Sequence, residues 1–171
     1  MKILFENEDI IAFNKTEYIR VQADASGRDS MEARAAEFLA ARSAGEPSPG
    51  DGGSAPEPPF IGLVHRLDQP VTGVVLFAKN PESLARMSGL FREGKMRKIY
   101  WAVIDAAPPS PEGTLEHHLV FNRRQNKVYA ARSPGKETKK ASLRYRLLGR
   151  SERYFLDRKS TRLNSSHGKL S

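Results

Sequence analysis

The chain has 171 residues and a formal net charge of +8 at pH 7, from 28 Lys and Arg against 20 Asp and Glu, which indicates affinity for polyanions rather than a particular fold. It contains no cysteine, which excludes disulfides and thiolate zinc sites and agrees with a cytoplasmic location. No run approaches the roughly 20 apolar residues that a membrane span needs, and the start lacks the apolar core of a signal peptide, so we expect no contact with a membrane.

The N-terminal part predicts a hairpin followed by a helix. Two short apolar runs, Ile3–Phe5 and Ile10–Phe13, predict strands joined by a tight turn. Met31–Arg42 predicts a helix, for which Asp29 or Ser30 is the expected cap. The apolar face of this helix is formed by Met31, Ala35, Phe38 and Leu39.

A loop and a strand separate this helix from the next one. Residues 43–59 consist mainly of Gly, Ser, Pro, Asp and Glu, which predicts a flexible loop or insertion. The apolar run Val74–Ala78 predicts a buried strand. The second helix is expected to begin with Asn80 as cap and Pro81 at its first position, and to end near Gly94.

Strands dominate the C-terminal half. Four segments have an apolar or alternating pattern: Ile99–Ile104, Thr114–Val120, Lys127–Ala130 and Ala141–Leu148. Because these strands follow one another through short turns, we expect an α+β fold with a mixed, largely antiparallel sheet and flanking helices.

The most informative motif runs from His65 to Gly73, immediately before the apolar run Val74–Ala78. It places Arg66 and Asp68 in a loop at the edge of a sheet, where an ion pair between them would keep the carboxylate ionised. A fixed, ionised carboxylate can act as a nucleophile or a base at neutral pH. The alternative is that Asp68 is a turn residue paired with Arg66 for structural reasons, because short motifs often match by chance.

This motif resembles the catalytic motif of the RluA-type pseudouridine synthases, which isomerise chosen uridines in ribosomal or transfer RNA. The likeness lies in the sequence His-Arg-Leu-Asp, in the Thr-Gly that closes the turn, and in the apolar strand that ends in Ala-Lys-Asn. Two further segments, Glu8–Lys15 and Lys98–Val103, are similar to that family in the expected order. The resemblance runs from about Ile3 to Leu156 and implies the fold of that family.

The resemblance implies that Asp68 is the catalytic carboxylate, assisted by Arg66 and Tyr100. Pseudouridine formation breaks the C1′–N1 bond, turns the uracil and rejoins it through C5, so a group must hold the intermediate. Asp68 would do this by attacking the sugar or the base, or would abstract a sugar proton, and the sequence favours none of these routes. Arg66 would hold Asp68 ionised or fill the space of a flipped uridine. Tyr100 would offer the uracil an aromatic face or a hydroxyl, unless it is a strand residue that fills the core.

The segment between Arg123 and Arg150 contains ten basic residues and a single acid, Glu137. Clusters of this kind neutralise phosphates and give salt-dependent affinity for nucleic acid. The alternative is a solvated surface, although mixed surface charge is rarely so one-sided. The residues expected to contact RNA are Arg123, Arg124, Lys127, Lys139, Lys140, Arg144 and Arg146.

Neither a metal nor a cofactor is indicated. His117 and His118 are neighbours on a predicted strand, so they point to opposite faces and cannot bind one metal ion together. No glycine-rich nucleotide-binding motif is present. The family resemblance and the basic segment instead indicate structured RNA, ribosomal or transfer RNA, as the partner. We expect a monomer when the protein is full length.

Two positions near the motifs depart from the family pattern. After Asn14-Lys15 the family continues Pro-x-Gly, a fixed turn, whereas this chain has Thr16-Glu17-Tyr18. Position 71 is Val where a hydroxyl residue is common. Neither change touches the expected chemistry, but both affect the geometry of the loops.

The C-terminus departs further. After Leu156 the family continues a strand toward a Gly-Arg-Thr-His-Gln-Ile-Arg segment that carries more of the active site, whereas Asp157–Ser171 resembles the translation of a common sequencing adapter. We therefore expect a fold that is incomplete at the C-terminus: residues 1–156 as a partial catalytic domain, residues 157–171 as a non-native disordered tail, and an inactive chain. The alternatives are an ordinary basic tail and a non-catalytic RNA-binding module of the same fold.

Overall fold

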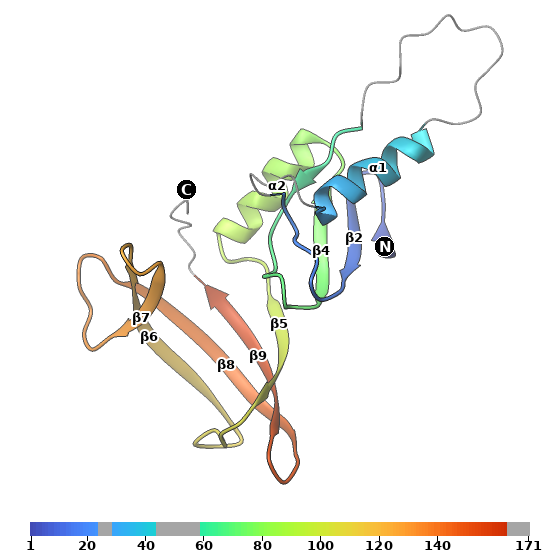
Figure 1. Ribbon diagram of the computed structural model, residues 1–171. Coiled ribbons are helices and arrows are strands. Elements are labelled where there is room, and N and C mark those ends of the chain that lie inside the picture. The colour runs from blue at the N-terminus through green and yellow to red at the C-terminus, as the bar shows by residue number, and fades with distance from the viewer. Residues whose placement is uncertain (24–28, 44–58, 164–171) are drawn as a thin grey trace, which may run out of the picture. The chain divides into compact units, whose positions relative to one another are not determined.

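In the computed structural model, the chain divides into two compact units, Met1–Gly89 and Leu90–Ser171 (Figure 1). The structure describes residues 1–23, 29–43 and 59–163. The described strands form two separate hydrogen-bonded sheets, and the single domain over residues 1–156 that the sequence indicated stays a prediction. Most of the predicted flexible loop, residues 44–58, lies outside the described residues.

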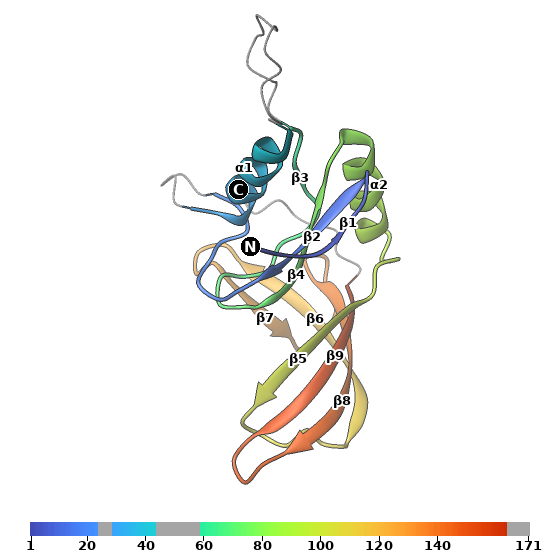
Figure 2. The same cartoon turned by 90° about the vertical axis from the view of Figure 1, so that its right-hand side faces the viewer.

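Four antiparallel strands form the sheet of the first unit, in the order β1-β2-β4-β3 (Figure 2). They are β1 (Lys2–Glu6), β2 (Ile10–Lys15), β3 (Gly62–Leu63) and β4 (Gly73–Ala78). The predicted hairpin of β1 and β2 is confirmed, and its turn is fixed by Asn7, whose Oδ1 accepts hydrogen bonds from the N–H groups of Asp9 and Ile10. The predicted strand β4 lies between β2 and β3, with Val75 and Phe77 fully buried.

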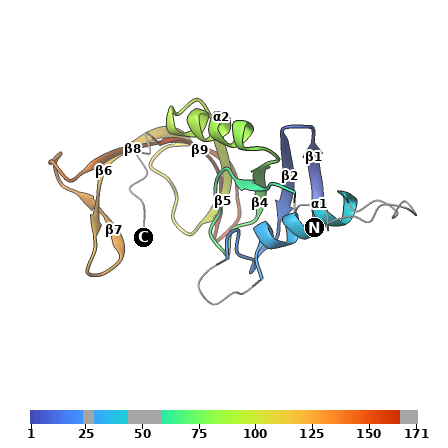
Figure 3. The ribbon, with the colours of Figure 1, turned by 90° about the horizontal axis from the view of Figure 1, so that it is seen from above.

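Two helices cover opposite faces of this sheet (Figure 3). The first, α1 (Met31–Ser43), begins at Ser30, whose Oγ accepts a hydrogen bond of 3.2 Å from the N–H of Ala33. Ser30 is therefore the cap, one of the two residues that the sequence indicated. The predicted apolar face packs on β2 and β4 and completes a buried core of Ile11, Phe13, Val21, Met31, Ala35, Leu39, Val75 and Phe77.

The second helix, α2 (Pro81–Arg92), has the predicted caps at both ends. The Oδ1 of Asn80 accepts a hydrogen bond of 2.8 Å from the N–H of Ser83. The Ser83 hydroxyl is buried and donates to Oδ1 of Asp9 at 2.6 Å, which ties the helix to the β1–β2 turn. At the other end, Gly94 has φ 67°, a left-handed conformation in which glycine carries no penalty.

The second unit contains a five-stranded antiparallel sheet in the order β5-β9-β8-β6-β7 (Figure 2). The strands are β5 (Lys98–Ile104), β6 (Glu112–Asn122), β7 (Lys127–Ala131), β8 (Lys139–Arg150) and β9 (Phe155–Leu163). The four predicted strands are thus confirmed, each slightly longer than the sequence indicated. On β8 the alternation also holds, because Tyr145 is buried whereas Arg144 and Arg146 are exposed.

Strand β9 differs from the sequence prediction, which expected a disordered tail from Asp157 onward. It lies between β5 and β8 and pairs with both, and Asp157 is buried, with its Oδ1 accepting a hydrogen bond of 3.1 Å from the N–H of Arg146. The prediction of disorder is therefore wrong for residues 157–163, because the open edges of two strands supply hydrogen-bond partners for this polar segment. Residues 164–171 lie outside the described residues, and the non-native origin of the segment stays a prediction.

Both sheets contain only antiparallel strand pairs, and an isolated parallel bridge joins Arg20 to Ser30. Together with the two helices, this arrangement confirms the predicted α+β class. Among the helices of the described residues, none is long and apolar enough to cross a membrane.

Candidate functional site

Asp68 lies in the loop that joins β3 to β4. The main-chain N–H of Val71 donates a hydrogen bond of 3.0 Å to the main-chain oxygen of Asp68, which closes a turn around Gln69 and Pro70. The side chains of Asp68 and Arg66 are both exposed, and no hydrogen bond or ion pair links them within the described part of the chain. This differs from the pairing that the sequence predicted, since an exposed ion pair contributes little to holding two side chains together. The carboxylate of Asp68 is accessible to a ligand.

Lys15, at the end of β2, holds the Asp68 loop. Its side chain is 1% exposed, and Nζ donates hydrogen bonds to the main-chain oxygens of Gln69 at 2.8 Å, Val71 at 2.7 Å and Thr16 at 3.1 Å. All three donors of the ammonium group are thus used by carbonyl groups. Sequence reasoning missed this role, and the available signal was a lysine that ends an otherwise apolar strand.

Burial and two nearby carboxylates act on the pKa of Lys15. Burial lowers the pKa of Lys15 because the ammonium group loses its hydration, whereas the charges of Glu17 and Asp68 act in the opposite direction. The Asp68 carboxylate is therefore within electrostatic reach of a buried cation. The loop thus presents an exposed carboxylate whose charge acts on the buried Lys15.

The two ends of the Asp68 loop are also fixed. The Nε2 atom of His65 accepts a hydrogen bond of 3.2 Å from the N–H of Leu76, so this ring nitrogen carries no proton. Gly73 has φ 135°, which other residues rarely adopt, while a Cβ there would meet only Leu67 at an ordinary distance of 3.7 Å. Backbone conformation rather than space therefore requires glycine at this position.

The segment after β2 is bonded to the same loop. The main-chain N–H of Tyr18 donates to the main-chain oxygen of Gln69 at 3.1 Å, and Nε2 of Gln69 donates to the main-chain oxygen of Tyr18 at 2.8 Å. Tyr18 has φ 66° and is 80% exposed. A left-handed conformation costs a residue with a Cβ roughly 1–2 kcal/mol. Tyr18 thus stands, at a cost, where the family turn would have its glycine.

A hollow of about 450 Å³ opens beside this segment. It is lined by Thr16, Glu17, Tyr18, Ile19, Arg20, Asp29, Arg34 and Gln69. Two arginines and two acids balance one another, and the Nε of Arg34 donates to Oδ1 of Asp29 at 2.8 Å. The hollow is therefore polar but has no net charge.

Tyr100 lies on β5 in the second unit and is half-buried. Because side chains alternate along a strand, it shares its face with Lys159, its partner on β9. The opposite face of β5 carries Ile99, Trp101 and Val103, all exposed. Tyr100 belongs to a different unit from Asp68, and its place in the catalytic site stays a prediction.

The strand register groups several of the predicted RNA-binding residues. Arg144 and Arg146 lie on one face of the sheet with Arg158, the β9 partner of Arg146. Lys127 and Lys140 share this face through the pairing of β8, β6 and β7. We call the side of the sheet that carries Arg144, Arg146 and Arg158 the arginine face.

The remaining predicted RNA-binding residues lie elsewhere. Lys139 is on the face opposite to the arginine face, the one that carries Tyr100. Arg123 and Arg124 lie in the turn between β6 and β7. The predicted set therefore does not form a single patch.

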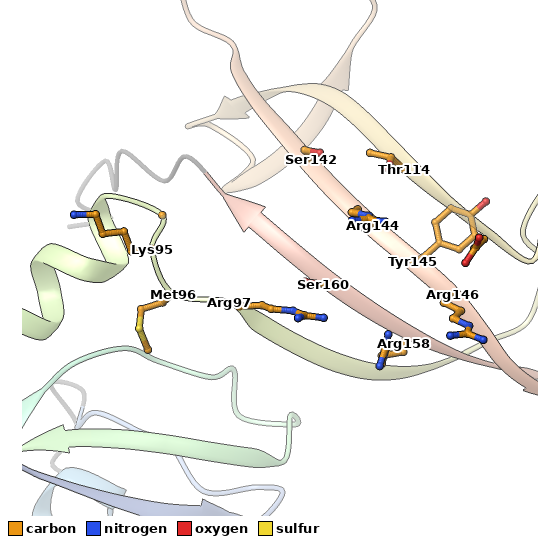
Figure 4. Close-up of a pocket in the computed structure, with 12 residues that line it drawn as sticks. Lys95, Met96, Arg97, Thr114, Ser142, Arg144, Tyr145, Arg146, Arg158 and Ser160 are labelled. Carbon is orange, nitrogen blue, oxygen red and sulfur yellow. The ribbon is translucent and has the colours of Figure 1, made fainter.

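A hollow of about 910 Å³ lies over the arginine face (Figure 4). Lys95, Arg97, Arg144, Arg146 and Arg158 are among its lining residues, and Glu112 is the one acid among them. The other lining residues are Gly94, Met96, Thr114, Ser142, Tyr145 and Ser160. The hollow is thus strongly basic. Sequence reasoning missed Lys95, Arg97 and Arg158. Arg158 lies beside Arg146 only through the register of β9, and Lys95 and Arg97 lie in the segment between α2 and β5.

No group of three or more His, Cys, Asp or Glu that could hold a metal ion occurs in residues 1–23, 29–43 and 59–163. His117 and His118 are consecutive on β6 and pair with Ala141 and Lys140, so their side chains lie on opposite faces of the sheet. The two histidines therefore do not converge on one ion.

Comparison with known proteins gives the family. The model of the RNA pseudouridylate synthase family matches residues 9–167. An uncharacterized RNA pseudouridine synthase of Haemophilus influenzae is 30% identical over 115 residues, 67% of this chain and 43% of that protein. Ribosomal large subunit pseudouridine synthase D of Borreliella burgdorferi is 31% identical over 87 residues, 51% of this chain and 26% of that protein.

The fold agrees with this result. Human RNA Pseudouridylate Synthase Domain Containing 4 superposes with a TM-score of 0.71 at 21% identity, over 96% of this chain and 60% of that one. The chain spans less than half the length of the curated relatives named above. With a match that covers most of the sequence, the chain belongs to the RNA pseudouridylate synthase family.

Proposed function

We propose that this protein isomerises uridine to pseudouridine in ribosomal or transfer RNA, in the cytoplasm and without a cofactor, with Asp68 as the catalytic carboxylate. The observation that carries the proposal is the exposed Asp68 carboxylate, on a loop whose backbone is fixed by the buried Lys15. Ribosomal RNA is favoured because the relative from Borreliella burgdorferi is named as a large-subunit enzyme.

The chemistry asks for a carboxylate in a fixed position. The C1′–N1 bond of the uridine breaks, a C1′–C5 bond forms, and the proton of C5 is replaced by one on N1, so the reaction is a rearrangement without a second substrate. Asp68 acts either as the nucleophile that holds the sugar or base or as the base that removes a sugar proton. A loop held by backbone hydrogen bonds keeps this group in place while the uracil turns.

Arg66 and Tyr100 complete the proposed site. Arg66 is exposed two residues before Asp68 and makes no ion pair with it in the described residues, which favours the second of its expected roles, filling the space of a flipped uridine. Tyr100 is proposed, from the family resemblance, as the aromatic group that supports the uracil.

The arginine face is proposed to bind RNA phosphates. Its hollow combines arginines from β8 and β9 with Arg97 from the segment before β5. Arginine guanidinium groups give bidentate contacts to phosphate, and these contacts are independent of base sequence. Tyr100, which is proposed to support the uracil, lies on the opposite face of the sheet. We therefore propose that the arginine face contacts phosphates of nucleotides other than the target uridine.

We further propose that the 171 residues alone bind RNA but do not isomerise uridine, and that the full-length protein is a monomer. This part rests on coverage, since the chain spans 43% and 26% of the two curated relatives named above. A version extended to the length of those relatives should be the active form.

The test is the Asp68→Asn variant in the extended version. We expect loss of pseudouridine formation with unchanged RNA affinity, because Asn keeps the size of Asp but is neither a nucleophile nor a base. Glu82→Gln, which removes an exposed carboxylate at the start of α2, should keep full activity. If Asp68→Asn stays active, Asp68 is not the catalytic carboxylate. If the extended version with Asp68 intact binds RNA without isomerising it, the non-catalytic RNA-binding module is the correct alternative.

A further inference from the structure

We propose that Tyr18 stacks on an unpaired RNA base next to the target uridine. This inference rests on the proposed function, because it places that base beside the loop that carries Asp68. It assigns a contact to a residue that differs from the family turn, in which a glycine is expected.

The backbone of Tyr18 is held in an unfavourable conformation. Its φ of 66° lies in the left-handed region, where a side chain is penalised and glycine is not. Among non-glycine residues of the described chain only Asn126 shares this feature, and Asn tolerates it well. A bulky aromatic residue at such a position needs a reason, and strained residues gather at ligand sites.

Within the part of the chain that the structure describes, no contact supplies such a reason. Tyr18 is 80% exposed, so its ring contributes little to the core. Within residues 1–23, 29–43 and 59–163, the Tyr18 side chain makes no hydrogen bond, ion pair or ring contact. The exposed ring is therefore accessible to a partner outside the chain.

The position of Tyr18 is nevertheless tied to the Asp68 loop. Both of its main-chain polar groups are hydrogen-bonded to Gln69, the residue that follows Asp68. The main-chain oxygen of Gln69 also accepts a hydrogen bond from Lys15. The ring thus starts from a fixed point beside the loop that carries Asp68.

The chemistry of the surroundings selects a base rather than a phosphate. The hollow beside Tyr18 has a volume of about 450 Å³, within the range of small-molecule sites. Its charges cancel, since Arg34 is hydrogen-bonded to Asp29 and the charge of Glu17 offsets that of Arg20. An aromatic ring next to a neutral polar hollow suits the flat face and polar edge of a nucleobase.

The experiment compares Tyr18→Gly with the unaltered 171-residue chain. Glycine removes the ring and relieves the backbone, so the melting temperature should not fall. Two fluorescent probes are titrated: a short oligouridylate, and an abasic oligomer of equal length that has the same phosphates but no bases. Tyr18→Phe should keep the ring contact, and Tyr154→Ala removes an exposed tyrosine of the second unit as a matched control. Tyr18→Asn, which also tolerates the left-handed region, is the second ring-free variant.

We expect Tyr18→Gly and Tyr18→Asn to weaken oligouridylate binding by roughly 5- to 150-fold, the range for loss of one stacked base. Binding of the abasic oligomer should be unchanged, and Tyr18→Phe and Tyr154→Ala should behave as the unaltered chain.

If the ring-free variants bind oligouridylate normally, the inference about Tyr18 is overturned while RNA binding by the arginine face stands. If they weaken binding of both probes equally, Tyr18 acts on phosphates and stacking is excluded. If the unaltered chain binds neither probe, RNA contact by this chain is wrong, and the inference is wrong with it.

Discussion

The ammonium group of Lys15 donates a hydrogen bond of 2.7 Å to the main-chain oxygen of Val71, 56 residues further along the chain. A second bond, of 2.8 Å, goes to the main-chain oxygen of Gln69. Pro70 between them has no N–H of its own to donate. A single buried cation therefore holds the turn that follows Asp68.

Replacing Lys15 by Met should loosen this turn. Met has a similar length but no donor, so the main-chain oxygen of Val71 loses the bond from Lys15, and that of Gln69 keeps only the bond from the N–H of Tyr18. We expect a loss of roughly 2–4 kcal/mol in the free energy of unfolding, measured with urea, since hydrogen bonds to charged groups contribute about 1.5–3 kcal/mol each and the relief of ammonium desolvation offsets part of the loss.

Hydrogen exchange locates the effect of the Lys15→Met change. The amides of Tyr18 and Val71, which bond to the loop, should exchange faster, whereas the amide of Phe77 in the centre of β4 should follow global stability only. Lys2→Met, at an exposed position of β1, should change stability by less than about 0.5 kcal/mol. Unchanged exchange at Tyr18 and Val71 would show that Lys15 does not hold the turn.

Two glycines should respond in opposite directions to replacement by Ala. Gly73→Ala forces φ 135° on a residue with a Cβ and should destabilise the chain by about 1–3 kcal/mol, although the new Cβ has room. Gly89→Ala lies within α2, where a Cβ would meet nothing within 4 Å, and should stabilise by up to about 1 kcal/mol. Thermal unfolding of the two variants tests both signs, and a neutral Gly73→Ala would mean that the loop adjusts its backbone.

Glu6 should contribute an acid-sensitive part of stability. Its carboxylate accepts hydrogen bonds from Lys79 at 2.8 Å and Arg42 at 2.6 Å, and these bonds, the one from Lys79 first, lower the pKa of Glu6 below its ordinary 4.5. Because the folded pKa lies below the unfolded one, the contribution is present above pH 4.5 and is lost as the pH falls through the folded value.

The Glu6→Gln variant tests this dependence. At pH 7 it should be less stable by about 1 kcal/mol, and the difference from the unaltered chain should shrink as the pH is lowered below 4.5. Glu82→Gln, at an exposed position of α2, should show no such trend. A difference that stays constant across this pH range would contradict the role of the two cations.

Local patterns in the sequence were enough to predict much of the fold. The hairpin, both helices and the caps Ser30 and Asn80 follow from apolar periodicity and capping chemistry, which act over a few residues. The motif also placed Asp68 in a loop immediately before a buried strand, where the structure has it.

The features that the sequence did not reveal depend on contacts between distant segments. Lys15 bonds to carbonyls 54 and 56 residues away, which no local pattern encodes. Residues 157–163 are polar and form a strand only because β5 and β8 offer hydrogen-bond partners on both sides. Arg158 likewise lies beside Arg146 because β9 pairs with β8 in this register, which the sequence alone does not indicate.

The salt dependence of RNA binding should separate the arginine face from the rest of the basic segment. Arg144→Ala with Arg146→Ala should flatten the slope of log Kobs against log salt by about 1.4, two contacts at roughly 0.7 each for a single strand. Lys139→Ala with Lys140→Ala should flatten it less, because these two residues lie on opposite faces and Lys140 is paired with Glu116 at 2.9 Å. The measurement is the affinity for an oligouridylate over a range of salt concentrations.

The outcome also separates phosphate contacts from base contacts. If stacking on Tyr18 releases no counterions, Tyr18→Gly should lower the affinity equally at every salt concentration and leave the slope unchanged. The double arginine variant should instead have its largest effect at low salt, where phosphate contacts are strongest. The double lysine variant and the double arginine variant could also flatten the slope equally. In that case RNA does not distinguish the two faces of this sheet, and the proposal that the arginine face binds RNA phosphates is wrong.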